Sequence, residues 1–354
     1  MRRAPPLRWS GPCLLFLLLL LAGCASLATE DAEKRHARAG LAIQAVYEEA
    51  LPTLPADKQR HYAQRLYRLT GDDRYLPLNR AYGERLLGWL ERDIAGLATP
   101  GYAERRSGEI VAAYPVGSSK QRARQRMLAG WGEIPFARQL LFRLAQADYH
   151  GLIPSLEGHE GALAYLAGVE WEAFLTDPDV LAIYAAQVAN QVHFLHQLGV
   201  MDLRQEVVAA FRQRYPPGSV ATLDRGEFHN WLYGLTHFVI AASRYYQQEV
   251  SVEEFAWVLA ALEREETRIL AMATEDILAE VALSFLLAGR GEHPLVARIR
   301  DMLVEAVDPA TGIIPSAEGG TDLARGEHRN VLAIMVLRWP GRLYPGPALS
   351  ADGL

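Results

Sequence analysis

The chain has 354 residues, of which 50% are hydrophobic and 22% charged, and its formal net charge at pH 7 is −6. A chain of this length can bury a large hydrophobic core, and a moderately acidic protein is a poor partner for nucleic acid. Of the two cysteines, Cys13 lies inside an apolar N-terminal segment and Cys24 directly after it. The rest of the chain therefore has no thiol for a disulfide, for a metal or for nucleophilic catalysis.

The first residues predict where the protein is found. Arg2, Arg3 and Arg8 precede the apolar run Leu14–Leu21. A basic region followed by a short apolar region is typical of a secretory signal. As a helix the run would cover about 12 Å, which is too short for a hydrocarbon core of about 30 Å.

The tetrapeptide Leu21-Ala22-Gly23-Cys24 resembles the lipobox of bacterial lipoproteins. The resemblance implies cleavage before Cys24, lipidation of this residue and a lipid bilayer as a partner. Ala25 follows, rather than Asp, and by resemblance to Gram-negative lipoproteins this favours the outer membrane, facing the periplasm. Loss of residues 1–23 removes three arginines and no acidic residue, so the charge falls from −6 to −9. The alternative is an ordinary signal peptide or a weak anchor, with Cys24 incidental.

After residue 30 the sequence is typical of one helix after another. Apolar residues recur at i, i+3, i+4 and i+7, and Gly, Pro or Asp interrupts the pattern at intervals. Alternating runs typical of strands are nearly absent. The expected helices span residues 31–50, 57–69, 74–97, 120–130, 132–149, 158–175, 178–199, 202–214, 226–248, 251–270, 274–288, 294–307 and 327–339.

Alternate expected helices begin roughly 50 residues apart, which indicates an internal repeat of helical hairpins. The segment Arg225-Gly226-Glu227-Phe228-His229-Asn230 recurs 100 residues later as Arg325-Gly326-Glu327-His328-Arg329-Asn330. Gly132-Glu133 begins a further expected helix in the same phase. Repeated hairpins that share a core can be stacked or arranged in a circle.

Two short motifs resemble α/α-toroid proteins, especially the six-hairpin glycosidase type. Leu69–Leu76 (LTGDDRYL) resembles their helix-to-helix turn, and Asp308–Pro315 (DPATGIIP) resembles the loop after an outer helix. The resemblance implies an all-α fold, an (α/α) toroid of about six helical hairpins over residues 31–345. A signal peptide (1–23) and a short tether (24–30) would precede it, and a tail (346–354) would follow. Long loops could decorate a cleft, and they span residues 99–119, 215–224 and 312–325.

In such a ring the inner helices run parallel, and their N-termini would meet at one rim. The polar residues gathered there would be Glu133, Asp177, Asp179, Glu227, His229, Asn230, Glu275, Asp276, Glu327, His328 and Asn330. Acidic and amide side chains are also favoured in the first turn of any helix, because free N–H groups and the helix dipole attract them. Capping is the simpler interpretation for Glu133, Asp177, Asp179 and Glu275, and it also applies to Glu227 and Glu327.

One helix face deserves a functional interpretation, because Asn230, Tyr233, Gly234 and His237 share it. The matched positions 100 residues later hold Asn330, Ala333, Ile334 and Leu337. A glycine inside a helix costs about 1 kcal/mol relative to alanine, so Gly234 needs a reason. The glycine is explained either by close approach of another helix or by room for a ligand. The polar face as a whole is either a buried hydrogen-bond network or a functional site.

Two chemistries fit the candidate residues. His229, Tyr233 and His237 can move protons, and Glu227 with Asp276 or Glu327 could form the carboxylate pair of an inverting glycoside hydrolase. Alternatively, the residue types resemble those with which toroid polysaccharide lyases neutralise a uronate and remove its α-proton. The candidates for that role are Asn230, His229 or His237, Tyr233, and Arg225 or Arg244. Further candidate binding residues are Trp231, Tyr245, His328 and Asn330.

We therefore expect an envelope-anchored hydrolase or lyase that acts on a glycan; the alternative is a non-catalytic lipoprotein that binds a glycan, a peptide or another partner. The enzyme hypothesis predicts an open cleft faced by Glu227, His237 and one of Asp276 or Glu327. We expect no cofactor and no metal, since His193 and His196 lack an evident third ligand. The basic run 120–126 is expected to be a solvated helix face, with contact to anionic lipid as the alternative.

Overall fold

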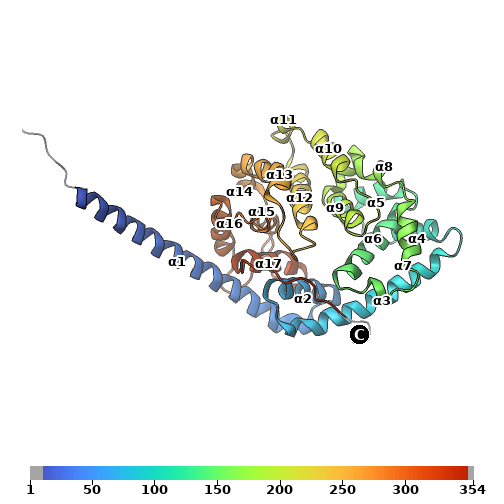
Figure 1. The fold of residues 1–354 in the computed structure, drawn as a ribbon, viewed down its shortest axis with the longest axis horizontal. Helices are drawn as coiled ribbons and strands as arrows, with labels where there is room; N and C mark the ends of the chain where they lie inside the picture. Colours follow the sequence, from blue (N-terminus) through green and yellow to red (C-terminus); the bar gives the residue numbers. More distant parts are fainter. Residues whose placement is uncertain (1–10, 350–354) are drawn as a thin grey trace, which may run out of the picture.

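A computed structural model describes the backbone of residues 11–349 and the side chains of residues 30–349 (Figure 1). The protein is all-α: 73% of it is helical, and no strand occurs within residues 11–349. The α-helices are α1 (Gly11–Ala50), α2 (Ala56–Thr70), α3 (Leu76–Leu97), α4 (Tyr102–Ala112), α5 (Ser119–Ala129), α6 (Ile134–Tyr149), α7 (His159–Ala167), α8 (Trp171–Thr176), α9 (Pro178–Gln197), α10 (Arg204–Arg214), α11 (Pro217–Val220), α12 (Arg225–Ala242), α13 (Val252–Arg264), α14 (Glu266–Met272), α15 (Glu275–Leu287), α16 (Pro294–Glu305) and α17 (Leu323–Leu337). Short 3₁₀ helices are η1 (Leu51–Thr53), η2 (Asp73–Tyr75) and η3 (Ile153–Ser155).

Six helices form an inner layer, namely α2, α6, α9, α12, α15 and α17. Along this layer α2 packs against α17, α17 against α15, α15 against α12, α12 against α9 and α9 against α6. Gln64 of α2 also donates a hydrogen bond of 3.2 Å to Gln146 of α6, and α3 packs against both helices. Figure 1 shows α3, α4, α10, α13 and α16 on the outside of this layer.

The inner helices run in the same direction, as contacts near both of their ends show. His61, in the second turn of α2, contacts Glu327, in the second turn of α17. At the other end, Arg68 of α2 donates to the carbonyl oxygen of Tyr245, which follows α12. The amino ends of the inner helices therefore share one side of the molecule, which we call the rim.

The join between α15 and α16 follows from its sequence. The apolar residues of α15, such as Ile277, Val281 and Phe285, are fully buried between α12, α16 and α17. Gly289 has a φ of +67°, a left-handed conformation that ends the helix without a Cβ clash. Pro294 is then the first residue of α16, where a missing N–H costs nothing. This αα-hairpin is as the sequence predicts.

Several expected boundaries were wrong. The expected loop 99–119 contains a helix, α4, and the expected single helices 158–175 and 251–270 are each two helices. The expected helix 226–248 ends at Ala242, because Arg244, Tyr245 and Tyr246 all have positive φ angles, between 54° and 71°. Three successive left-handed residues without glycine are costly, since each L-residue pays about 1–2 kcal/mol in this conformation.

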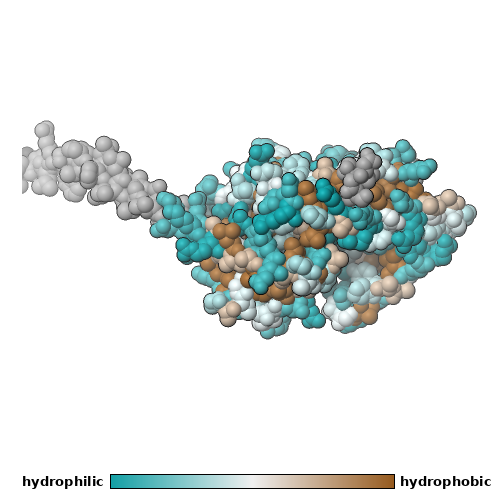
Figure 2. Space-filling model, turned by 90° about the horizontal axis from the view of Figure 1, so that it is seen from below, coloured by the Kyte–Doolittle hydropathy of each residue, from teal (hydrophilic) through white to brown (hydrophobic). Residues whose placement is uncertain are grey.

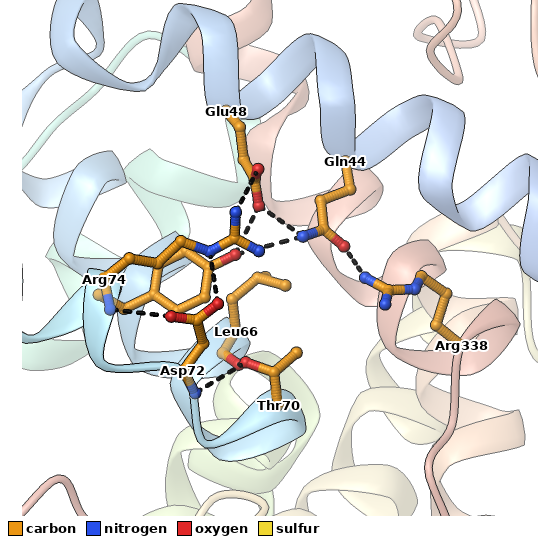
Figure 3. Close-up of polar contacts among 8 residues, drawn as sticks. Gln44, Glu48, Leu66, Thr70, Asp72, Arg74 and Arg338 are labelled. Carbon is orange, nitrogen blue, oxygen red and sulfur yellow. Dashed lines mark hydrogen bonds and ion pairs between the residues drawn. The ribbon is translucent and has the colours of Figure 1, made fainter.

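Polar side chains connect the turn between α2 and α3 with α1 and with the residue after α17 (Figure 3). The side chain of Arg74 contacts Asp72 at 2.9 Å and Glu48 of α1 at 3.0 Å. Gln44, one turn before Glu48, donates to that carboxylate and accepts from Arg338, which follows α17. This polar cluster holds the end of α17 and the start of the helical layer against α1.

The segment after α17 covers the side of the molecule opposite the rim. The backbone N–H of Tyr344 donates to the carbonyl of Arg68, and the Arg68 side chain donates to the carbonyl of Gly346, each at 2.9 Å. The N–H of Leu349 donates to the carbonyl of His150, which follows α6. The first part of the expected tail is thus packed against the carboxyl ends of the inner helices.

The exposed surface is mostly polar where it is visible from below (Figure 2), and apolar residues lie there as separate patches. Within the part of the chain that the structure describes, no helix combines the length and apolarity needed to cross a bilayer. The side chain of Cys24 lies outside the described residues, as do residues 1–10 of the expected signal peptide.

Candidate functional site

A cavity of about 470 Å³ lies among the inner helices. Its lining side chains come from α2, α4, α6, α9, α12 and α17, together with Tyr114 after α4 and Tyr245 after α12. The basic and polar members of the lining are Arg60, His61, Gln64, Arg65, Tyr114, Arg138, Gln139, Gln146, Gln187, Asn190, Gln191, His237, Tyr245 and His328. Three guanidinium groups and three imidazoles thus face the cavity, and its lining contains no aspartate or glutamate.

A histidine–carboxylate pair, His61 and Glu327, stands beside the cavity. Nδ1 of His61 lies 2.7 Å from Oε1 of Glu327, whose side chain has no exposed surface. Burial raises the pKa of Glu327 to about 7, although Arg65 and His328 act in the opposite direction. Burial also lowers the pKa of His61 well below 6.5, with a further contribution from Arg65. Near neutral pH it is therefore the carboxyl group of Glu327, and not the imidazole of His61, that gains or loses a proton.

A second carboxylate, Glu280 of α15, holds the other two imidazoles. Its Oε2 accepts a hydrogen bond of 2.7 Å from Thr236, and its Oε1 lies 3.6 Å from Nε2 of both His237 and His328. Burial by itself raises the pKa of Glu280, but the two imidazoles outweigh it, so the pKa lies well below its ordinary value. Nδ1 of His237 also contacts Oδ1 of Asn190 at 2.9 Å. Glu280 is thus an ionised, buried anchor for two cavity-facing histidines.

The arginines of the cavity lack carboxylate partners among the residues with described side chains. Arg65 is 6% exposed. Among the described residues, four buried side-chain atoms of residues that line the cavity have no hydrogen-bond partner: Nε of Arg65, Nε of Arg138, Oε1 of Gln139 and Oε1 of Gln191. Burial lowers the pKa of Arg60 and of Arg138. Buried polar atoms are nearly always paired in native proteins, so this group is suited to a polar ligand that supplies the missing partners.

The left-handed turn after α12 forms part of the cavity wall. Tyr245, in the middle of the turn, lines the cavity and stacks on Phe194 with ring centroids 5.9 Å apart. Its carbonyl accepts a hydrogen bond of 2.8 Å from Arg68. Backbone strain of this kind is concentrated at functional sites, where the surrounding structure holds it in place.

The structure brings only part of the predicted site to this cavity. His237, Tyr245 and His328 line it, and Glu327 lies directly behind His61. Glu227 does not join them: it is exposed, and it forms a capping box in which its N–H donates to Asp224 and its carboxylate accepts from the Asp224 N–H. The predicted grouping of Glu227 with His237 is therefore wrong, because the side chain of Glu227 serves the start of its own helix.

Tyr233 and Asp276 form a separate contact near the rim. The Tyr233 hydroxyl donates to Asp276 at 2.6 Å, and the ammonium group of Lys120 lies 5.2 Å from the centre of the Tyr233 ring. Arg124, one turn after Lys120 on α5, packs on Tyr184 of α9 in the same way. The basic run 120–126 was expected to be a solvated face, but these two of its cations cover aromatic rings of inner helices.

Other predicted residues have structural roles. Asn230 donates to the carbonyls of Leu181 and Ala182, and Asn330 bonds both the N–H and the carbonyl of Ile314. His229 contacts the carbonyl of Met272, and Trp231 lines an outer groove beside α10 and α13. Arg244 pairs with Asp148, and Arg225 is exposed. These residues lie outside the cavity lining.

The structure also answers why residue 234 is glycine. A Cβ at Gly234 would lie 2.5 Å from Cε2 of Phe211 and 2.9 Å from Cβ of Ala185. Close approach of α9 and α10, rather than space for a ligand, therefore requires the missing side chain.

Sequence reasoning missed four important residues: Arg60, His61 and Arg65 of α2, and Glu280 of α15. A signal for Glu280 was present, since it is the one acidic residue in the apolar run 277–287, four residues after Asp276. The α2 residues carried no comparable signal, because they have the composition of a solvated helix face. Within the described side chains, no group of three or more His, Cys, Asp or Glu is placed to hold a metal ion.

Comparison with known proteins gives a family but no activity. No curated protein and no solved structure matches the chain. A family model described as a domain of unknown function, DUF3541, matches residues 36–353, which include every helix that lines the cavity. The chain therefore belongs to the DUF3541 family.

Proposed function

We propose that this protein is a lipid-anchored enzyme of the bacterial cell envelope that cleaves an acidic glycan by β-elimination in the cavity, within an (α/α) toroid of six hairpins. The observation that carries the proposal is the lining: three guanidinium groups, three imidazoles and several amides, with no carboxylate among them. Such a lining attracts an anion and offers proton-transfer groups next to it.

The chemistry of a uronate fits this lining. Pairing of its carboxylate with a guanidinium group stabilises the negative charge that develops when the proton at C5 is removed. The C5–H electron pair then forms a C4=C5 double bond, the C4–O bond breaks, and the departing oxygen receives a proton. The step needs no water and no oxidant, because one proton moves from carbon to oxygen.

Elimination is favoured over hydrolysis for a geometric reason. An inverting hydrolase needs two carboxyl groups that face the substrate about 6.5–9.5 Å apart, and a retaining one needs two about 5–5.5 Å apart. Glu280 and Glu327 are each held behind imidazoles, and Glu227 is a capping residue. No carboxyl group lines the cavity, and the two glutamates beside it, Glu280 and Glu327, contact histidines instead.

The proposed anchor rests on the tetrapeptide that ends at Cys24 and on the short distance in sequence from there to the helical body. Several buried acyl chains, at about 0.8 kcal/mol for each methylene group, would hold the protein at a membrane. The test is incorporation of labelled palmitate and partition into the membrane fraction for the wild type and Cys24→Ala. The variant should lose both, whereas a membrane-bound, unlabelled wild type would contradict the proposal.

The reaction is tested with purified protein lacking residues 1–24 and a panel of polyuronates, beside neutral glucans as controls. Elimination creates an unsaturated uronate that absorbs in the ultraviolet, whereas hydrolysis releases reducing ends without this absorbance. If new reducing ends form without this absorbance, the protein is a hydrolase and the proposed elimination is wrong.

A non-catalytic binding protein is the second candidate, and one observation favours it. Both nitrogens of His237 face protein groups, Asn190 and Glu280, as in a closed structural network. Binding of an acidic oligosaccharide without any bond cleavage would support this candidate.

A further inference from the structure

The three imidazoles of the cavity are not equivalent, because His61 lies 2.7 Å from its carboxylate, whereas His237 and His328 each lie 3.6 Å from theirs. Nδ1 of His237 contacts an amide oxygen, which can only accept, so this nitrogen carries a proton. Its Nε2 and that of His328 both lie 3.6 Å from the ionised Oε1 of Glu280. A carboxylate between these two Nε2 atoms favours a proton on each of them, so neither Nε2 offers a lone pair to a substrate.

His61 is arranged differently. Its Nδ1 contacts Glu327 at 2.7 Å, and its Nε2 has no hydrogen-bond partner among the described side chains and backbone groups. The ring belongs to the cavity wall and is 18% exposed. When a carboxylate accepts a proton from Nδ1, the imidazole is fixed in the tautomer that has its lone pair on Nε2.

The neighbours of His61 suit the removal of a proton next to a carboxylate. Arg60 precedes it, and Arg65 follows one turn later on the same helix, so its side chain lies close to that of His61. Both arginines line the cavity, and Nε of Arg65 is buried without a partner. In a uronate the acidic proton is on the carbon that carries the carboxylate. A base and an anion-binding group must therefore be adjacent, and α2 provides both.

We infer that His61 is the catalytic base, with Glu327 as the residue that positions it, an inference that rests on the proposed function. Nε2 of His61 takes the proton from C5, the C5–H pair forms the C4=C5 bond and the C4–O bond breaks. The imidazolium returns the proton to the departing oxygen, so atoms and charge balance without another reactant. Glu327 keeps Nδ1 protonated throughout and stabilises the imidazolium.

The protonation state of Glu327 decides whether His61 is competent. If Glu327 is protonated, its O–H donates to Nδ1, and the ring proton moves to Nε2, which then has no lone pair for the substrate. If Glu327 is ionised, Nδ1 carries the proton and Nε2 is free. The charged and titratable groups that face the pair are Lys58, Arg60 and Arg65 of α2, His328 of α17, with Glu280 of α15 behind it, and Tyr47 of α1.

Activity should therefore rise with pH as Glu327 ionises, near its pKa of about 7. His61→Ala should lower kcat at least about 100-fold and change KM only a few-fold, as expected for loss of a general base. Glu327→Gln should lower kcat and remove the rise of activity around pH 7, and Glu327→Asp should restore part of both. A merely structural role of Glu327 would lower stability and leave the pH profile unchanged.

The chain offers a matched control. His36 also contacts a carboxylate, Asp301, at 2.8 Å, but it lies between α1 and α16, outside the cavity lining. His36→Ala should keep the wild-type kcat and pH profile. If His61→Ala retains kcat within about three-fold while the wild type cleaves polyuronates, the base is another group and the proposed function stands.

A spectroscopic measurement tests the tautomer without turnover. In protein labelled with ¹⁵N-histidine, the His61 signals, assigned with His61→Ala, should show the proton on Nδ1 at pH 8 and on Nε2 at pH 5.5. Glu327→Gln should abolish this exchange. A proton on Nε2 at pH 8 would overturn the inference even if the enzyme is a lyase. If the tautomer is as expected and no polyuronate is cleaved, the proposed function fails and the catalytic assignment fails with it.

Discussion

The helices α12 and α17 carry the same pattern, Arg-Gly-Glu-x-x-Asn, yet they use its glutamate in opposite ways. In α12 the capping residue is Asp224, directly before the pattern, so Glu227 is the third residue of the helix and completes a capping box. In α17 the capping residue is Asp322, two positions earlier relative to the pattern, so Glu327 lies in the second turn and is fully buried. The position of the capping aspartate relative to the motif thus determines whether the glutamate caps its own helix or lies buried beside the cavity.

The asparagine of the pattern does not diverge. Asn230 and Asn330 are both buried, and both bond to backbone groups of another segment, at Leu181 and at Ile314 respectively. A repeated motif can thus keep one residue in the same structural role while a neighbouring residue takes a different role.

The largest effect on stability is expected at the shared asparagine. Asn330→Ala removes the partners of both the N–H and the carbonyl of Ile314 in a fully buried site, and unpaired buried groups cost about 1–3 kcal/mol each. We expect urea unfolding to show a loss of about 4 kcal/mol, and a somewhat smaller loss for Asn230→Ala. A loss in only one of the two variants would contradict the common role.

The two glutamates should differ in how they affect stability as pH changes. Because the pKa of Glu327 is raised from 4.5 to about 7, the unfolded chain releases this proton first, and the free energy of unfolding falls as pH rises between these values. The loss is about 3 kcal/mol, from about 1.4 kcal/mol for each pH unit. Glu327→Gln should abolish it, which denaturant unfolding at pH 5 and pH 8 would measure. Glu227→Gln should leave the pH dependence as in the wild type.

A third prediction concerns Gly234, near the middle of α12. The equivalent position of the repeat in α17 holds a larger residue, Ile334. Gly234→Ala places a methyl group 2.5 Å from the Phe211 ring, so neighbours must shift. Overpacking of this kind costs about 1–3 kcal/mol, and we expect about 2. Thermal unfolding would detect it, and an unchanged midpoint would mean that α9 and α10 can move apart without cost.

Loss of the capping box should have a smaller effect. Glu227→Ala leaves the N–H of Asp224 without its side-chain partner. We expect a loss of about 0.5–1 kcal/mol in the free energy of unfolding, and no change in kcat or ligand affinity. A strong effect of this substitution on activity would show that Glu227 belongs to the functional site after all.

The smallest difference should come from the paired glycines. At Gly226 an added Cβ meets only Asp224, at 3.4 Å, so Gly226→Ala should stabilise the protein by about 0.5 kcal/mol. At Gly326 the Cβ would lie 3.1 Å from the hydroxyl of Tyr47, which donates to the carbonyl of Leu323. Gly326→Ala should therefore bring no gain. Equal gains in calorimetric unfolding would show that the two helix starts are equally open.

Much of the fold was predictable because local signals specify it. Asp177, Asp224 and Pro294 sit at or beside the start of a helix, and the positive φ of Gly289 ends one. The helix α17 begins at Leu323, four residues before the start at residue 327 that the sequence pattern predicts. Because of this difference, the sequence pattern puts Glu327 in the first turn, where a capping role is the simpler interpretation.

The site was less predictable, for a physical reason. Water and a polar ligand favour the same residue types, so a helix face toward a polar cavity cannot be told from one toward solvent. Arg60, His61 and Arg65 of α2 therefore gave no signal. His237 was found because a polar face broke an otherwise apolar helix, and Glu280 was detectable by the same argument.

The packed segment after α17 has a consequence for the order in which the protein is made. Arg68 is buried, and its side chain donates to Gly346, 278 positions later in the chain. During translation the guanidinium group lacks that partner until all the described helices, through α17, have been synthesised. The earlier helices can form hairpins as they leave the ribosome, since their contacts are local. The final docking of residues 344–349 is then a late, long-range event, and a nascent chain that stalls before it would expose the carboxyl ends of α2 and α6 to chaperones and proteases.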